Sequence, residues 1–218
     1  AGVDIAATES SEPGGSGGGR RGRPIGTWRG PTSGGSSWHT AGVLIGPIRS
    51  EDLPTVHAIN QAEVPAVGSA TVERLARIVE WSMIALVAID RTHPADPDGI
   101  AGFCLVLAPG SDYDSGNYRW FCDRYADFVY LDRVAIAPAF RRRGIARRLY
   151  GEVERHTVLA RPSAPWFTLE VNLEPRNDPS LDFHTELGFV EVGQRTAADG
   201  SVVALMTKPL HPVSEPAR

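Results

Sequence analysis

The residues best suited to chemistry are three consecutive arginines and a glycine, Arg141 to Gly144. An apolar run from Phe128 to Ala137 precedes them and predicts a strand, which Pro138 should end because proline cannot donate to a sheet ladder. Apolar residues then recur every fourth position from Ile145 onward, which predicts a helix. A helix N-terminus after a glycine turn offers unpartnered N–H groups and the positive end of the helix dipole. These residues therefore predict a binding site for phosphate or pyrophosphate.

The basic character of this stretch has two other interpretations. Residues 141–148 include five arginines, and such a cluster can contact nucleic-acid phosphates or form a plain basic surface. The whole chain, however, has a net charge of −4 and a pI near 5.9, which does not favour a general nucleic-acid binder. We therefore expect no nucleic-acid partner.

The same stretch resembles the acyl-CoA-binding motif of the GNAT acetyltransferase superfamily, which runs Arg/Gln-x-x-Gly-x-Gly/Ala after a strand. Here the motif reads Arg141-Arg142-Arg143-Gly144-Ile145-Ala146, after a strand that ends in Val134-Ala135-Ile136-Ala137-Pro138. In the family, the backbone amides of this turn bind the CoA pyrophosphate, and the preceding strand pairs with the pantetheine arm. The resemblance thus implies that residues 134–136 and 141–146 bind acetyl-CoA.

A second segment resembles the C-terminal signature of the same family, Asn-x-x-Ala-x-x-Phe-Tyr-x-x-x-Gly-Phe. The matching residues are Asn177, Phe183, Gly188 and Phe189, with Ser180 at the small-residue position. His184 stands where many members have a tyrosine that protonates the departing CoA thiolate. The resemblance implies that Asn177 and His184 contact the cofactor. We hypothesise that His184 donates this proton, because imidazole titrates near ~6.5; the alternative is a histidine that only fills the space of the tyrosine.

The reaction that the resemblance implies is acetyl transfer from acetyl-CoA to an amine by direct attack on the thioester. The developing oxyanion needs a donor, which we expect to be a backbone N–H between Val134 and Ile136. Asp132 and Glu170 lie in predicted strands and are the candidate general bases. With strict alternation, Asp132 shares the side of Val134 and Ile136. An ion pair between Asp132 and Arg133 and a water-relayed proton path are the alternatives.

The acceptor contacts are expected from two other parts of the chain. Residues 108–127 form a long predicted connection, and a loop of this length inside a compact domain is often functional. Its aromatic residues could form a lid over the acceptor or a small core against the sheet. Asn60, Tyr118 and Trp120 are the expected substrate-binding residues. The resemblance does not choose between a small amine, an amino acid, an antibiotic and a protein N-terminus.

The domain organisation follows from composition. Residues 1–40 are rich in glycine and serine and predict a disordered tail, residues 41–210 form the catalytic domain, and residues 211–218 form a C-terminal tail. The predicted order of elements is β α α β β β α β α β β. This order predicts an α/β (α+β) class. It also matches the order of elements in the GNAT acyl-CoA N-acyltransferase fold, so the resemblance implies a mixed central sheet of six to seven strands flanked by about four helices.

The remaining features set the expected partners and location. The two cysteines, Cys104 and Cys122, have no metal-ligand spacing and indicate no disulfide framework, so we expect no metal and a cytoplasmic protein. No apolar run is long enough to span a membrane, so no membrane partner is expected. Homodimerisation through the C-terminal strands is an open expectation. The competing function is a non-catalytic acyl-CoA-binding regulatory domain, which the missing tyrosine favours.

Overall fold

The computed structural model of the protein describes residues 42–92, 99–197 and 199–211. The tail predicted at residues 1–40, and all of the C-terminal tail except His211, lie outside the described residues. The described elements in chain order are β1 (Val43–Pro47), η1 (Ser50–Asp52), α1 (Leu53–Ala62), α2 (Val72–Trp81), β2 (Ile84–Asp90), β3 (Ile100–Leu107), α3 (Gly116–Cys122), β4 (Val129–Ile136), η2 (Pro138–Phe140), α4 (Ile145–Ala160), β5 (Trp166–Glu174), α5 (Asp178–Glu186), β6 (Val190–Thr196) and β7 (Val202–Pro209).

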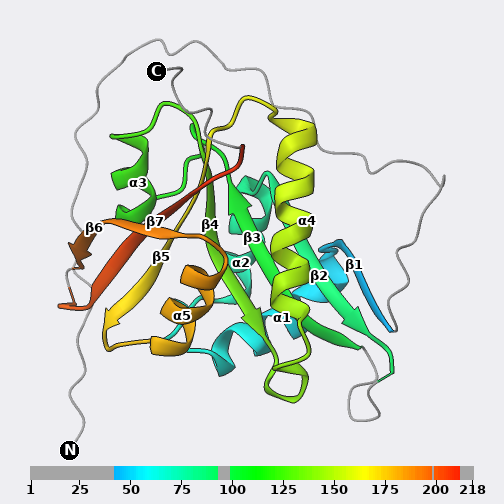
Figure 1. Ribbon diagram of the computed structural model, residues 1–218. Helices are drawn as coiled ribbons and strands as arrows, with labels where there is room; N and C mark the ends of the chain where they lie inside the picture. Colours follow the sequence, from blue (N-terminus) through cyan, green and yellow to red (C-terminus); the bar gives the residue numbers. More distant parts are fainter. Residues whose placement is uncertain (1–41, 93–98, 198, 212–218) are drawn as a thin grey trace, which may run out of the picture. The chain divides into compact units, whose positions relative to one another are not determined.

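Within the described residues, seven strands form one mixed sheet in the order β1-β2-β3-β4-β5-β7-β6. Only the central pair, β4 and β5, runs parallel, and α4 is the crossover helix between them. These two strands pair only at Val129–Phe167 and Tyr130–Thr168, and beyond that point they diverge (Figure 1). The predicted fold class is confirmed, and the elements follow the predicted order along the chain with one further helix, α3, between β3 and β4. The sheet is open at its centre.

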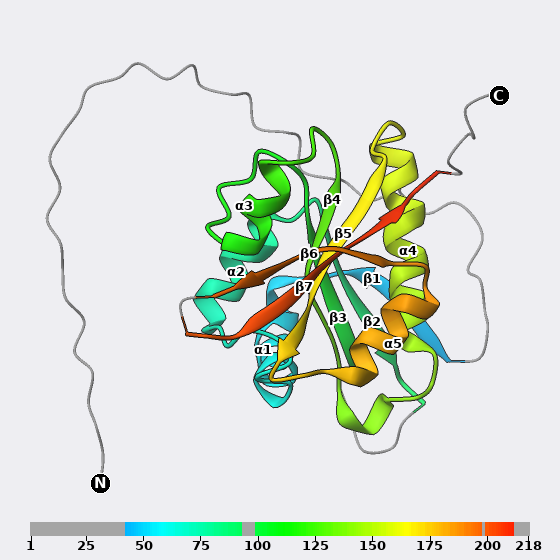
Figure 2. The ribbon, with the colours of Figure 1, turned by 60° about the vertical axis from the view of Figure 1, so that its left-hand side comes forward.

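Two apolar cores cover the two faces of the sheet. Helices α4 and α5 pack on one face, where α4 contributes Ile145, Leu149 and Val153 to the core. Helices α1, α2 and α3 pack on the other face, where Leu75 and Phe121 are fully buried (Figure 2). No helix among the described residues is long and apolar enough to cross a membrane.

Helix α3 was not predicted and lies inside the connection that was expected to be a loop. Ser115 caps it by accepting hydrogen bonds from the backbone N–H groups of Asn117 and Tyr118. Tyr118 and Phe121, three residues apart, point into the core beside Phe128. A helix of seven residues gives too short a periodic pattern to be recognised in the sequence. The small-core alternative for this connection is therefore the one that the structure supports.

A β-bulge in β4 decides which side chains face the site. The register of β3 and β4 shifts so that Leu105 pairs with Arg133 and Val106 pairs with Leu131, which leaves Asp132 as the extra residue. Val134 packs on the α4 face, whereas Asp132 bonds Tyr113, which belongs to the core on the opposite face. The prediction that Asp132 shares the side of Val134 and Ile136 is therefore wrong, because the extra residue resets the alternation.

The close approach of β3 to β4 makes a stability prediction. A Cβ on Gly102 would lie 2.6 Å from the carbonyl oxygen of Ala135 and 2.6 Å from Cδ1 of Ile136, whereas a Cβ on Gly46 would meet nothing within 4 Å. Gly102→Ala should lower the free energy of unfolding by about 1–3 kcal/mol through overpacking. Gly46→Ala should change it by no more than about 0.5 kcal/mol. Urea denaturation of both variants is the measurement, and equal stabilities would contradict the prediction.

Candidate functional site

A large cavity of about 1220 Å³ opens where β4 and β5 diverge. Its walls come from the α1–α2 loop, the turn between η2 and α4, the start of α5 and the β6–β7 connection. The predicted cofactor turn and the candidate base Glu170 both line it, although 26 residues separate Gly144 from Glu170 in the sequence. The cavity therefore brings the two predicted halves of the site together.

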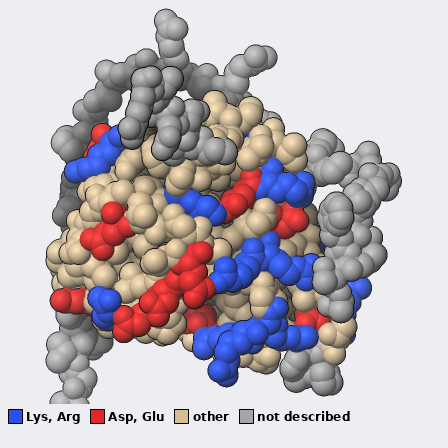
Figure 3. All heavy atoms as spheres, viewed as in Figure 1, with Lys and Arg blue, Asp and Glu red and all other residues tan. Residues whose placement is uncertain are grey.

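The turn before α4 has the backbone conformation that an anion site requires. Gly144 precedes the helix with a φ of 74°, and Arg142 also has a positive φ of 59°. The N–H groups of the first helical turn, from Ile145 on, have no acceptor within the helix and open toward the cavity wall. Arginine and lysine side chains gather over the lower part of this face, beside acidic side chains to their left (Figure 3). These features fit a pyrophosphate at this turn.

The three arginines of the turn do not act alike. Arg141 and Arg142 line the cavity, and Arg141 forms an ion pair with Glu63 at the end of α1. Arg143 turns away and pairs with the buried Asp90 at 2.8 Å, at the end of β2. Because its side chain anchors the turn to the sheet, the prediction that Arg143 binds the cofactor can hold only for its backbone N–H.

The open edge of β4 presents main-chain groups to the cavity. The N–H of Ala137 donates to the carbonyl of Ala101 on β3 at 2.9 Å, so the alternating residues Ala135 and Ala137 direct their main chain toward β3. Val134 and Ile136 then direct their N–H and C=O groups toward the diverging edge. This arrangement agrees with the predicted pantetheine contacts and with an oxyanion donor at Val134, and it leaves Ala135 to line the cavity by its side chain only.

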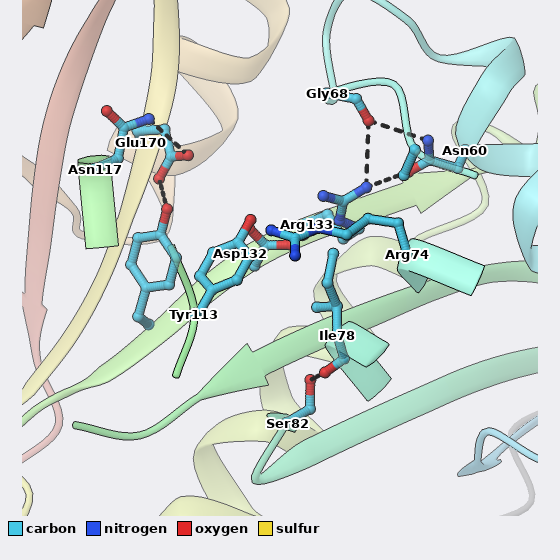
Figure 4. Close-up of polar contacts among 12 residues, drawn as sticks. Asn60, Gly68, Arg74, Ile78, Ser82, Tyr113, Asn117, Asp132, Arg133 and Glu170 are labelled. Atoms are coloured by element: carbon cyan, nitrogen blue, oxygen red, sulfur yellow. Dashed lines mark hydrogen bonds and ion pairs between the residues drawn. The ribbon is translucent and has the colours of Figure 1, made fainter. Parts of the chain in front are cut away.

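Glu170 lines the cavity and is held by two neutral hydrogen-bond donors. Nδ2 of Asn117 donates to its Oε1 at 3.0 Å (Figure 4). The Tyr130 hydroxyl donates to its Oε2 at 2.6 Å. Arg195 in turn donates to Oδ1 of Asn117 at 3.0 Å, which fixes the orientation of the amide. Burial raises the pKa of Glu170 to about 7, against the opposing effect of the Tyr130 hydrogen bond. A carboxyl with this pKa can accept a proton near neutral pH.

Asp132 has another task. Its side chain is 4% exposed and accepts from Nε of Arg133 at 2.6 Å and from the Tyr113 hydroxyl. Burial and the neighbouring Asp132 carboxylate raise the pKa of Tyr113 well above its usual range, so its hydroxyl stays protonated and donates. The ion-pair alternative for Asp132 is thus what the structure shows. Asp132 also lines the cavity, and its role as a general base stays a prediction.

Asn60 is also corrected, from a substrate contact to a structural residue. Its side chain is fully buried, and Oδ1 accepts from Nη1 of Arg133 at 2.9 Å (Figure 4). Both Asn60 and Arg133 donate to the carbonyl of Gly68, at 3.1 and 3.2 Å. Together they hold the α1–α2 loop against the β4 bulge, so Asn60 shapes the acceptor wall without facing it.

His184 lines the cavity but is 4% exposed, in a cluster of aromatic rings. Its Nδ1 lies 2.6 Å from the carbonyl oxygen of Ser180, which requires an N–H there, so Nε2 accepts from the Tyr150 hydroxyl at 2.5 Å. Burial lowers the pKa of His184 to about 4, against the effect of the Ser180 hydrogen bond. The histidine therefore has no free proton to donate, and the space-filling alternative fits this arrangement better than proton donation.

Three further predicted contacts have structural roles. Tyr118 is buried, donates to the carbonyl of Ala108 at 2.7 Å and does not line the cavity. Trp120 packs against Gly193 of β6 and is likewise outside the cavity wall. Asn177 lines the cavity and caps α5 by accepting from the N–H of Ser180 at 3.2 Å. The prediction that Tyr118 and Trp120 bind the substrate is therefore corrected, because neither residue lines the cavity.

Sequence reasoning missed Tyr113, Asn117 and Tyr130, which contact the two acidic residues of the site. Tyr130 carried one usable signal, since a buried tyrosine hydroxyl in a central strand needs a partner. Asn117 carried none, because its position depends on the unpredicted helix α3.

The buried histidine predicts how stability depends on pH. The folded protein binds the proton of His184 only near pH 4, whereas the unfolded chain binds it near ~6.5. Neutral His184 therefore makes its full contribution to the free energy of unfolding above about pH 6.5. As the pH falls, this contribution decreases by about 3 kcal/mol at most. His184→Phe should remove this part of the acid destabilisation, although the unpartnered Tyr150 hydroxyl lowers its stability at neutral pH. Urea denaturation of the wild type and of His184→Phe between pH 4.5 and 7.5 tests this. The same dependence of the free energy of unfolding on pH in both proteins would refute it.

Comparisons with known proteins agree with this geometry. Residues 122–210 match the family model described as an acetyltransferase (GNAT) domain, and no curated protein matches the chain. The fold resembles the ribosomal-protein-S18-alanine N-acetyltransferase from Escherichia coli, with 17% identity, a TM-score of 0.57, and coverage of 81% of this chain and 99% of that one. It also resembles Arabidopsis thaliana NAA60 in complex with acetyl-CoA (19% identity, TM-score 0.60, coverage 77% and 99%).

A third solved structure, an acetyltransferase of the GNAT family from Streptococcus pneumoniae, is 17% identical, with a TM-score of 0.56 and coverage of 77% of this chain and 98% of that one. At these identities, the likeness shows a shared fold. The matched segment runs from the end of α3 to the end of the sheet and contains both sequence motifs. Residues 122–210 are therefore similar to the acetyltransferase (GNAT) domain, and the described residues share the fold of these acetyltransferases.

Proposed function

We propose that the protein is an N-acetyltransferase that transfers the acetyl group of acetyl-CoA to a primary amine by direct attack. The GNAT domain match and the N-acetyltransferase neighbours, one of them crystallised with acetyl-CoA, support acetyl transfer. The observation that carries the proposal is the single cavity that joins the glycine turn before α4 to the carboxyl of Glu170. A cofactor held at one end thus meets a base at the other.

The cofactor end is built from main-chain groups. The pyrophosphate of acetyl-CoA binds the N–H groups that follow Gly144, with Arg141 and Arg142 beside it. The pantetheine arm lies along the open edge of β4, where Val134 and Ile136 offer their main-chain groups. This edge ends near the site where β4 and β5 part, so the thioester is delivered close to Glu170.

The chemical step then needs one base and one oxyanion donor. Glu170 takes a proton from the acceptor ammonium, and the neutral nitrogen attacks the thioester carbon. The N–H of Val134 stabilises the oxyanion of the tetrahedral intermediate. When the C–S bond breaks, one of the two protons on the nitrogen passes through water to the CoA thiolate, and the other stays on the amide product. The pKa of the thiol is about 8.5. No proton from His184 enters this sequence.

Cofactor binding at the turn is tested by two charge-matched variants of the same helix region. Gly144→Glu places a carboxylate and a Cβ at a position with φ of 74°, next to the pyrophosphate. Gly151→Glu adds the same charge in the middle of α4, at an exposed position with nothing within 4 Å of the new Cβ. Calorimetric titration with acetyl-CoA should show binding weakened about tenfold or more in Gly144→Glu only. Equal affinities would contradict the assignment, and no binding by the wild type would overturn the function.

Glu170 is tested by the pH dependence of the reaction. The base must be ionised, so kcat/KM should fall as the pH drops below the Glu170 pKa of about 7. Glu170→Gln should lower kcat by about 10²–10⁴-fold and remove this inflection, with acetyl-CoA affinity unchanged. Asp132→Asn, the matched change at the other acidic residue, should keep the inflection. If acetyl-CoA bound saturably but no amine caused the release of CoA, the result would instead support the non-catalytic regulatory domain.

A further inference from the structure

The acceptor half of the cavity, defined here as the walls formed by residues 64–69, Asn117, Glu170, Asn172 and residues 199–203, has an uneven distribution of charge. We propose that the acceptor is a primary amine without an ionised carboxylate on its α-carbon, so that amides, peptides and simple amines are acetylated and free amino acids are not. This inference rests on the proposed function and specifies its substrate.

Two carboxyl groups of the acceptor half have no arginine or lysine partner within the described residues. Glu170 is bonded only to the neutral Tyr130 and Asn117. Asp199 is exposed and accepts from the N–H and hydroxyl of Ser201. Both groups attract a cation and repel an anion. An amine that enters as ammonium is therefore favoured at this end.

The single arginine near Glu170 that lines the cavity is already neutralised. Arg133 is 7% exposed, pairs with Asp132 and donates to Asn60 and Gly68. The other arginines that line the cavity, Arg141, Arg142 and Arg147, belong to the turn and the first turn of α4 at the cofactor end. Arg195, which does not line the cavity, donates to Oδ1 of Asn117 at 3.0 Å. Among the described residues that line the acceptor half, none thus offers an unpaired cation to an incoming carboxylate.

A free amino acid would place its carboxylate one carbon from the amine that Glu170 must deprotonate. Two carboxylates would then lie close together in a partly buried site, and such like-charge contacts cost several kcal/mol unless a cation compensates them. An amide or a hydrogen in place of the carboxylate removes this repulsion while leaving the amine in position. The charges of the acceptor half therefore disfavour a free amino acid relative to its amide or its decarboxylated amine.

The test compares three forms of one acceptor: an amino acid, its amide, and the amine left after removal of the carboxyl group. Alanine, phenylalanine and leucine each supply such a series, and their side chains carry no second amine, so that side-chain preference is averaged. The amide amine is less basic than that of the amino acid, and the decarboxylated amine is more basic, so basicity alone cannot favour both. CoA release should give a kcat/KM about tenfold or more higher for both forms that lack the carboxylate.

A charge-gain variant sharpens the comparison. Ala66 is exposed and lines the acceptor half, and the preceding residue, Pro65, accepts at 3.1 Å from Asn172, two residues after Glu170 on β5. Ala66→Arg should raise kcat/KM for the amino acids several-fold relative to their amides. Ala66→Gln adds a polar side chain of similar reach without charge and should leave the ratio as in the wild type.

The outcomes separate this inference from the proposed function. Amino acids acetylated as well as or better than their amides would overturn the substrate class and leave the acetyltransferase function standing. An unchanged ratio in Ala66→Arg would show that charge is not the selecting property and would also overturn the inference. If none of the amines in these series gave CoA release, the proposed function itself would be overturned.

Discussion

The buried charge of Arg133 is the constraint on which the acceptor side depends. A guanidinium this far from water is tolerated only when it is paired and its donors are satisfied. Asp132 supplies the counter-charge, and Asn60 and the carbonyl of Gly68 accept two further hydrogen bonds from Nη1. Because these partners come from α1 and the α1–α2 loop, satisfying one arginine also positions a wall of the cavity. The β4 bulge makes the pairing possible by directing two successive charged residues to one face.

The open centre of the sheet follows from the same strand. β4 is paired with β3 from Tyr130 to Ile136 apart from the bulge at Asp132, but it meets β5 at only two residue pairs. Main-chain groups that a continuous sheet would satisfy internally are then left for a ligand to satisfy. In the function proposed above, cofactor and acceptor approach this gap from opposite ends, with an arginine-rich turn at one end and acidic groups at the other. This division of charge would give each substrate its own entrance.

Much of this organisation could be predicted from the sequence, and the exceptions have identifiable causes. The strand, turn and helix around Gly144 were predictable because hydrophobic period and turn chemistry agree there. The position of Asp132 was not, since a one-residue bulge leaves no mark in a pattern of alternation. The role of His184 was also hidden, because its ring depends on Tyr150, 34 residues away. Glu170 was identifiable as an acidic residue in a strand, but its raised pKa comes from burial that only the assembled fold provides.

The ion pair between Arg141 and Glu63 links the two ends of the cavity directly. Arg141 belongs to the cofactor turn, and Glu63 begins the loop that borders the acceptor. A phosphate that drew Arg141 toward itself would weaken its attraction to Glu63 and shift the preferred conformation of that loop. An acceptor that prefers the shifted loop would then bind more tightly when the cofactor is present. By thermodynamic linkage, the acceptor would increase the affinity for the cofactor by the same factor. One ion pair would thus make the affinities of the two substrates interdependent, with a sensitivity to ionic strength that neither site would have alone.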